Sequence, residues 1–183
     1  MAGSDVKPVI VSDEVALDAD GISTAASVGN NAALTIGGAL ADSGSVTNAS
    51  GRQVTILSAG NDSGISFTVV GTDVNGAALS DTVTGTNAGT ATSSVYFKTI
   101  TSITAVGNPA GNVSAGINAS AADVIFAGRS RLRGAYLTST GTAGTIDLLN
   151  TSPTGSSIMK ISSVASATAT RNITVPSDGV LFD

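Results

Sequence analysis

The stretch ISFTVVGTDVNGAALSDTVTG, residues 65–85, consists of two short runs of alternating apolar and polar residues separated by a turn. In the first run Phe67 and Val69 fall on one face of an extended chain, because successive side chains of a β-strand point to opposite sides. The turn contains Asn75–Gly76, a pair that accepts the positive φ angles of a tight hairpin turn. The stretch therefore predicts a β-hairpin, with strands at residues 65–71 and 79–85.

Runs of the same kind recur on both sides of this hairpin, each bounded by Gly, Asn, Asp or Ser. Short strands spaced about 8 to 14 residues apart, with turn residues between them, are typical of a β-sandwich or barrel. Because no helical periodicity is sustained, we predict an all-β fold, an antiparallel β-sandwich or barrel. The further strands are expected in NAALTIGG (31–38), RQVTILSAG (52–60) and VYFKTITSITAVG (95–107).

Two details refine the predicted sheet. Asp81 falls on the apolar face of the second hairpin strand, which indicates an edge strand or a shallow core. In residues 95–107 the apolar positions change parity between Phe97 and Ile100, and Val106 is expected on the same apolar side. Such a change of parity predicts a β-bulge.

Composition divides the chain into three parts. Residues 1–20 combine Pro8 and a short apolar run with an acidic stretch, and we expect an extended N-terminal arm. Residues 21–120 are predicted to form the β-sandwich domain. The segment 107–123, which spans the expected boundary, is rich in Gly, Asn and Ala and is interpreted as loop and linker. Residues 121–183 are predicted to form a small C-terminal β module. Its strands are expected in TIDLL (145–149), IMKI (158–161), NITV (172–175) and VLF (180–182).

The C-terminal module is small for an independent core, since domains below about 70 residues rarely stabilise themselves by burial alone. We therefore expect it to pack against its neighbour or against other subunits.

The residue types that are missing exclude much chemistry. The chain contains no histidine and no cysteine, so it lacks Ser-His-Asp triads, thiolate nucleophiles, and zinc, copper, haem or iron–sulfur sites built from those ligands. Glu14 is the single glutamate, and a catalytic pair of aspartates such as Asp62 and Asp81 is not suggested by their spacing. We predict that the protein is not an enzyme and binds no cofactor.

The charge balance also limits the partners. The formal charge is −5 with eight basic residues, which argues against nucleic acid as a partner. No stretch approaches the ~18 to 20 apolar residues of a membrane span, and we predict no membrane partner.

Two short segments, residues 18–21 and 73–76, resemble the opening of a calcium-binding loop. Neither is followed by the glutamate that completes such a loop, and D-x-N-G is also an ordinary hairpin turn. No metal site is therefore predicted.

Three of the eight basic residues fall within five positions, at alternate places along the chain. On a strand they project from one face, a spacing that can bind a row of carboxylates or phosphates, although a solvated strand face has the same pattern. The last apolar run near the C-terminus is expected to need cover. The predicted partner-binding residues are Arg129, Arg131, Arg133, Val180, Leu181 and Phe182.

Residues 51–117 resemble a module of structural proteins of tailed bacteriophages, marine ones included. The resemblance rests on the blocks SAGNDSG, GTDVNG, TVTGTNAGT, YFKTITSI and GNVSAG, taken as a set. The blocks RSRLRGAYLTSTGTAGTIDLLN and SDGVLFD resemble a small β module of phage virion proteins, which tends to continue past GVLFD into a further strand. Because this chain stops at Asp183, its last sheet is expected to be completed by a neighbouring chain or to be closed differently.

Together with the low charge, the resemblance implies a non-enzymatic capsid decoration or cement protein. It would bind the head surface of the virion as a homo-oligomer, with a trimer favoured, contact the major capsid protein or other virion proteins, and be assembled in the host cytoplasm. A neck, tail or fibre-adaptor subunit is the alternative within the virion. An adhesive or carbohydrate-binding β domain is a further alternative, disfavoured because aromatic residues make up 3% of the chain.

Overall fold

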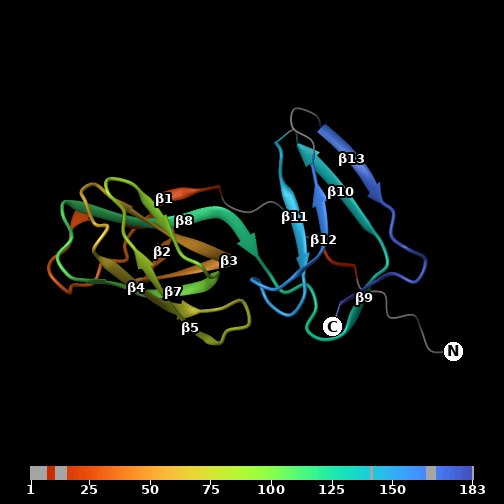
Figure 1. Cartoon of the computed structure of the whole chain (residues 1–183), viewed down its shortest axis with the longest axis horizontal. Helices are drawn as coiled ribbons and strands as arrows, with labels where there is room; N and C mark the ends of the chain where they lie inside the picture. The colour runs from red at the N-terminus through yellow and green to blue at the C-terminus, as the bar shows by residue number, and fades with distance from the viewer. Residues whose placement is uncertain (1–7, 11–15, 141, 164–167, 183) are drawn as a thin grey trace. The chain divides into compact units, whose positions relative to one another are not determined.

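The computed structural model describes residues 8–10, 16–140, 142–163 and 168–182. The regular elements among them are all β-strands, which confirms the predicted all-β class. No helix long and apolar enough to cross a membrane is found in this part of the chain. The chain divides into two compact units, Met1–Val124 and Ile125–Asp183, and Figure 1 labels most of their strands. The domain boundary expected near residue 120 lies inside the last strand of the first unit.

The first unit, as far as its residues are described, is built on one antiparallel sheet of eight strands. They are β1 (Asp18–Ser27), β2 (Ala41–Asp42), β3 (Ser45–Ser58), β4 (Ser66–Thr72), β5 (Ala78–Thr84), β6 (Thr90–Thr92), β7 (Phe97–Val106) and β8 (Asn112–Ala122). Six of them follow the order β1-β8-β3-β7-β4-β5, and β2 and β6 pair with β3 beside this path. Strands β1 and β5 end the path and are not paired with each other, so the fold is a β-sandwich and not a closed barrel.

Strand β3 connects the two layers of the sandwich. Its first residues pair with β7, whereas its later residues pair with β8 on one edge and β6 on the other. The register with β7 shifts between Thr47 and Arg52, where β3 changes neighbours. Irregularities of this kind bend a strand and increase its twist. One continuous sheet can thereby cover both sides of the core.

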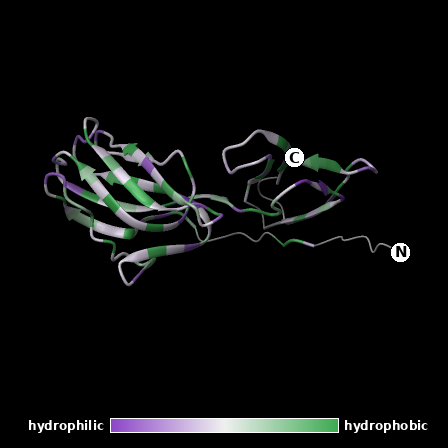
Figure 2. Ribbon diagram, turned by 90° about the horizontal axis from the view of Figure 1, so that it is seen from below, coloured by the Kyte–Doolittle hydropathy of each residue, from purple (hydrophilic) through white to green (hydrophobic). Residues whose placement is uncertain are grey.

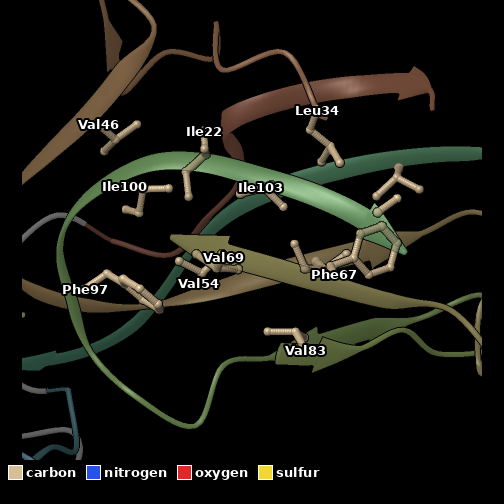
Figure 3. Close-up of a cluster of buried hydrophobic side chains, with 14 of the residues drawn as sticks. Ile22, Leu34, Val46, Val54, Phe67, Val69, Val83, Phe97, Ile100 and Ile103 are labelled. Atoms are coloured by element: carbon tan, nitrogen blue, oxygen red, sulfur yellow. The ribbon is translucent and has the colours of Figure 1, made fainter. Parts of the chain in front are cut away.

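The core of the first unit is aliphatic apart from two phenylalanines, and Figure 3 shows how its side chains converge from opposing strands. Figure 2 shows the alternation of hydrophobic and less hydrophobic residues that builds this core, as green and pale bands along the strands. The buried residues are Ile22, Val28, Leu34, Val46, Val54, Ile56, Phe67, Val69, Val83, Phe97, Ile100, Ile103, Ala105, Val113, Ala115 and Ile117.

The predicted hairpin is present as β4 and β5. Phe67 pairs with Val83 and Val69 pairs with Asp81, in unbroken antiparallel register. Strand β5 is an edge of the sheet, as the position of Asp81 indicated. At this edge the Asp81 carboxylate accepts a hydrogen bond from the Ser94 backbone N–H at 2.8 Å, so the charge is not buried without a partner.

The hairpin turn differs in detail from the prediction. Gly76 has a φ of +82°, but Asn75 is not among the residues with positive φ, so the expected pair is reduced to one residue. Asp73 compensates, because its Oδ1 accepts hydrogen bonds from the backbone N–H groups of Asn75 at 2.8 Å and Ala77 at 2.9 Å. The hydrogen bonds to the Asp73 side chain therefore hold the turn without a second residue of positive φ.

A bulge is present in β7, but it lies beyond Ile100 and not between Phe97 and Ile100, where the change of parity placed it. Ile100 and Ser102 pair with consecutive residues of β4, which leaves Thr101 as the extra residue. Beyond the bulge Ile103 is buried, whereas Val106 is 53% exposed. The prediction that Val106 lies on the apolar side was wrong, because the extra residue reverses which positions face the core.

Residues 107–123, interpreted from the sequence as loop and linker, contain strand β8, which lies between β1 and β3. Val113 and Ile117 alternate with smaller residues and are buried. Gly116 is required here because a Cβ atom would overlap the backbone oxygen of Asp18 on the neighbouring strand. The small residues that suggested a loop instead allow two strands to approach closely.

The N-terminal arm can be compared with the structure only in part. Residues 1–7 and 11–15 lie outside the described residues. Strand β1 begins at Asp18, inside the predicted arm, and Asp18 pairs with Ile117. The last three arm residues therefore belong to the sheet.

The strand expected at residues 31–38 is instead a loop that lies along β7. Ala33 forms an isolated bridge with Thr104, and the Leu34 N–H donates a hydrogen bond to the Ile103 oxygen at 2.8 Å. The buried Leu34 side chain explains why the segment is apolar without being a strand.

The described residues of the second unit form three antiparallel ladders of two strands each. They pair β9 (Ser130–Leu132) with β14 (Val180–Phe182), β10 (Ala135–Thr140) with β13 (Thr168–Ile173), and β11 (Thr145–Leu149) with β12 (Ser157–Ser162). The predicted strands TIDLL, IMKI and VLF correspond to β11, β12 and β14, and NITV overlaps the end of β13.

Candidate partner-binding surface

The ladder of β9 and β14 brings together the two groups of residues that the sequence singled out. Arg131 pairs with Leu181, and Leu132 and Ser130 pair with the residues on either side of it. The strand near the C-terminus thus pairs within its own chain. We refer to Arg129, Arg131, Arg133, Val180, Leu181 and Phe182 as the arginine ladder.

The arginines of this ladder are exposed. Arg131 lies in β9, whereas Arg129 and Arg133 flank the strand and do not belong to it, so the three arginines do not share one strand. Arg131 Nη1 donates to the Asp178 backbone oxygen at 2.9 Å, and Arg133 Nη1 donates to the Ser177 oxygen at 3.2 Å. Each bond uses one of the five N–H donors of a guanidinium and holds it over the turn before β14.

The apolar part of the ladder is only half-buried. Val180, Leu181 and Phe182 all have intermediate exposure. Among the described residues of the second unit, Ile161 is the only buried hydrophobic residue, whereas Phe126 and Tyr136 are 55% and 67% exposed. Two-stranded ladders are marginally stable in water without a hydrophobic face to pack against. This unit therefore lacks the core that the first unit has.

The two aspartates considered as a catalytic pair bind different segments of the first unit. Asp62 is fully buried, and its Oδ1 accepts a hydrogen bond from the Ala110 N–H at 2.6 Å. Asp81 binds Ser94 at the edge of the sheet. The Asp62 carboxylate therefore has a structural contact that joins two loops.

We expect replacement of Asp62 by alanine to lower the free energy of unfolding by about 1 to 3 kcal/mol, because the Ala110 N–H loses its acceptor. Urea denaturation of the purified chain measures this. Asp42→Ala, at an exposed carboxylate, is the control, with an expected change within about 0.5 kcal/mol. Equal effects of the two substitutions would contradict the structural role of Asp62.

The two calcium-like segments do not form loops suited to a cation. Residues 18–21 lie in β1, and the Asp73 carboxylate at the start of the second segment is engaged by backbone N–H groups of its own turn. Among the described residues, no group of three or more His, Cys, Asp or Glu is placed to hold a metal ion.

Charge is distributed unequally between the two units. The first contains three basic and ten acidic residues, a net charge of −7, and the second contains five basic and three acidic residues, a net charge of +2. These values add to the −5 of the whole chain. Counting charge separately for each predicted domain would have revealed this contrast from the sequence.

The arginine ladder combines exposed guanidinium groups with half-buried apolar side chains, a composition typical of surfaces that bind other proteins. Arginine is enriched at such surfaces because its planar group forms paired hydrogen bonds with carboxylates. No family model, curated protein or solved structure matches this chain.

Proposed function

We propose that this protein is a non-enzymatic structural subunit of a tailed-phage virion, a capsid decoration or cement protein that works as a homo-oligomer on the head surface. The observation that carries the proposal is the second unit, whose described apolar side chains are almost all accessible while its arginines are exposed. The resemblance of residues 51–117 to phage structural modules supports the virion as the location.

Burial by a partner would stabilise the second unit substantially. Covering a Leu or Phe side chain contributes about 1.5 to 3 kcal/mol when it is fully removed from water, and roughly half of that for a half-buried one. The apolar residues of the arginine ladder are half-buried, so the smaller value applies to them. A subunit of this kind gains stability when it is assembled, which suits a protein that reinforces a shell.

The arginines are the groups that would select the partner. Their guanidinium groups are suited to carboxylates on the major capsid protein or on other virion proteins. We favour a trimer, because three copies related by a three-fold axis match the three-fold positions of a capsid lattice.

Quantitative mass spectrometry of purified particles of the phage that encodes the chain tests the proposal. On the order of hundreds of copies per particle supports a decoration protein, since decoration follows the symmetry of the shell. About six or twelve copies would instead indicate a neck or tail subunit. Absence of the chain from the particles would overturn the proposal.

Removing the ladder's charges should weaken binding to particles. Replacing Arg129, Arg131 and Arg133 together by glutamine should cost roughly 2 to 5 kcal/mol of binding for each charge pair that is desolvated in the contact. Solvated arginines would lose about 0 to 1 kcal/mol for each pair. Particle sedimentation with added protein measures the difference.

Lys160→Gln is the control for this measurement. Lys160 belongs to another ladder and forms an ion pair with Asp147 at 3.4 Å, with 60% of its side chain exposed. The Lys160→Gln substitution should leave particle binding unchanged. Wild-type binding by the triple variant, with an unchanged salt dependence, would show that the arginines are an ordinary solvated surface.

A further inference from the structure

We propose that copies of this chain associate head to tail, with the arginine ladder of one copy against the acidic first unit of the next. The inference rests on the proposed function in one respect, since it names the partner of the same surface. Its basis is the contrast between net charges of −7 and +2 on the two units. Two second units repel each other, whereas a first and a second unit attract.

The acidic surface that meets the arginine ladder can be narrowed to a few carboxylates. Those that accept the shortest backbone hydrogen bonds within the first unit are set aside. Three of its aspartates accept hydrogen bonds of 2.6 to 2.9 Å from backbone N–H groups of turns and loops. These bonds join Asp62 to Ala110, Asp73 to Asn75 and Ala77, and Asp81 to Ser94. Asp123, at the end of the unit, accepts from the Val124 N–H at 2.8 Å.

The other described aspartates of the first unit are Asp18, Asp20 and Asp42, which we call the acidic end. Two of them make local contacts: Asp18 Oδ1 accepts from the Asp20 backbone N–H at 3.3 Å, and Asp42 Oδ1 accepts from the Ser43 hydroxyl at 2.9 Å. Asp20 and Asp42 are exposed, and Asp18 is half-buried. The Leu40 N–H donates to the Gly21 oxygen at 2.8 Å, which holds the segment before β2 against β1. A Cβ atom at Gly21 would meet both the Asp18 carboxylate and the Leu40 side chain. The three carboxylates therefore lie on adjoining segments.

The two surfaces match in number and in chemistry. Residues 129 and 133 are about 13 Å apart on an extended chain, a span over which three carboxylates can be bound. Each carboxylate can accept two parallel N–H bonds from one guanidinium. The contact would also cover the half-buried apolar side chains of β14.

A head-to-tail contact joins two different surfaces of the same chain. Such contacts generate a closed ring if the rotation between copies closes, and an open chain if it does not. Three copies closed in this way form a ring with the three-fold symmetry proposed above.

Two charge-reversal variants of the full chain test the inference. The basic variant carries Asp18→Lys, Asp20→Lys and Asp42→Lys, and the acidic variant carries Arg129→Glu, Arg131→Glu and Arg133→Glu. Light scattering at low salt should show that the wild-type chain self-associates. This self-association should weaken as salt is added, because salt screens the charges. Each variant alone should self-associate at least about tenfold more weakly, because its two surfaces then carry charge of the same sign.

Mixing the two variants in equal amounts distinguishes a contact between copies from one within a copy. The mixture should form complexes that contain both variants, because each surface again meets one of opposite charge. A closed ring of three cannot alternate two kinds of chain, so these complexes should be heterodimers or open chains. A chain carrying all six substitutions should recover self-association. If the contact lay within one copy, neither mixing nor protein concentration would have an effect, and the inference would be overturned.

A control variant separates position from total charge. Lys98→Glu, Lys160→Glu and Arg171→Glu change the net charge as much as the acidic variant does, and should weaken self-association less than about threefold. Circular dichroism of each variant verifies that it is folded.

Other outcomes overturn the inference in recognisable ways. Self-association of the basic variant at wild-type strength would indicate contact between two second units. A wild-type chain that stays monomeric at all concentrations would exclude the head-to-tail contact, while its presence in purified particles would leave the proposed role as a virion subunit standing.

Discussion

Replacement of Phe67 by alanine is expected to lower the free energy of unfolding of the first unit by about 3 to 5 kcal/mol. Phe67 is fully buried on β4, where it pairs with Val83 of β5 on one side and with Ala105 of β7 on the other. Removing the ring leaves a void that the strands on both sides cannot close without breaking their register. Urea denaturation followed by circular dichroism measures the loss.

The matched control is Val70→Ala on the same strand. Val70 is 38% exposed on the opposite face, so its truncation should cost less than about 1 kcal/mol. A Phe67 variant that unfolds at the same urea concentration as the Val70 variant would contradict the assignment of this face to the core.

Substitution of Gly60 by alanine should destabilise the first unit by more than about 3 kcal/mol. A Cβ atom at this position would overlap the backbone oxygen of Ala110, and backbone atoms cannot move aside as the end of a side chain can. The displaced loop would also weaken the 2.6 Å hydrogen bond between the Ala110 N–H and Asp62. The midpoint of thermal unfolding is the appropriate measurement.

Gly64→Ala is the control for this steric argument. No atom lies within 4 Å of the place where its Cβ would be, and its φ is not in the left-handed region. The change should be neutral, or stabilising by about 0.4 to 1 kcal/mol through the entropy of the unfolded chain. Comparable losses of stability in both variants would indicate that the flexibility of the glycine backbone matters, and not the overlap of a Cβ atom with Ala110.

The parts of the fold that the sequence predicted correctly are those governed by neighbouring residues. The hairpin of β4 and β5 depends on an alternation next to a turn, and its detail fails only where Asp73 takes over from Asn75. Strand β8 was missed because its alternation uses Val113 and Ile117 among Gly, Ser and Asn, which are also loop residues. What makes it a strand is the pairing with β1 and β3, and such long-range pairing is not visible in a local pattern.

The same distinction applies to the candidate site. The alternate spacing of Arg129, Arg131 and Arg133 was readable, but their proximity to Leu181 follows from a strand pairing across about fifty residues. The burial of Asp62 was equally hidden, because an aspartate within NDSG is typical of an exposed turn. Its backbone does form that turn, whereas its carboxylate binds Ala110 in a distant loop.

The position of β8 between β1 and β3 has a consequence for how the chain is made. Ser27 pairs with Asn112, so β1 has no partner on that edge until residues 112–122 have been synthesised. At about 5 to 20 residues per second, the delay between the two strands is roughly 5 to 20 s. During that time the nascent chain exposes the edge of β1, and that of β3 once it has been made, to proteases and to other nascent chains. The first unit becomes resistant to both only once its last strand has left the ribosome.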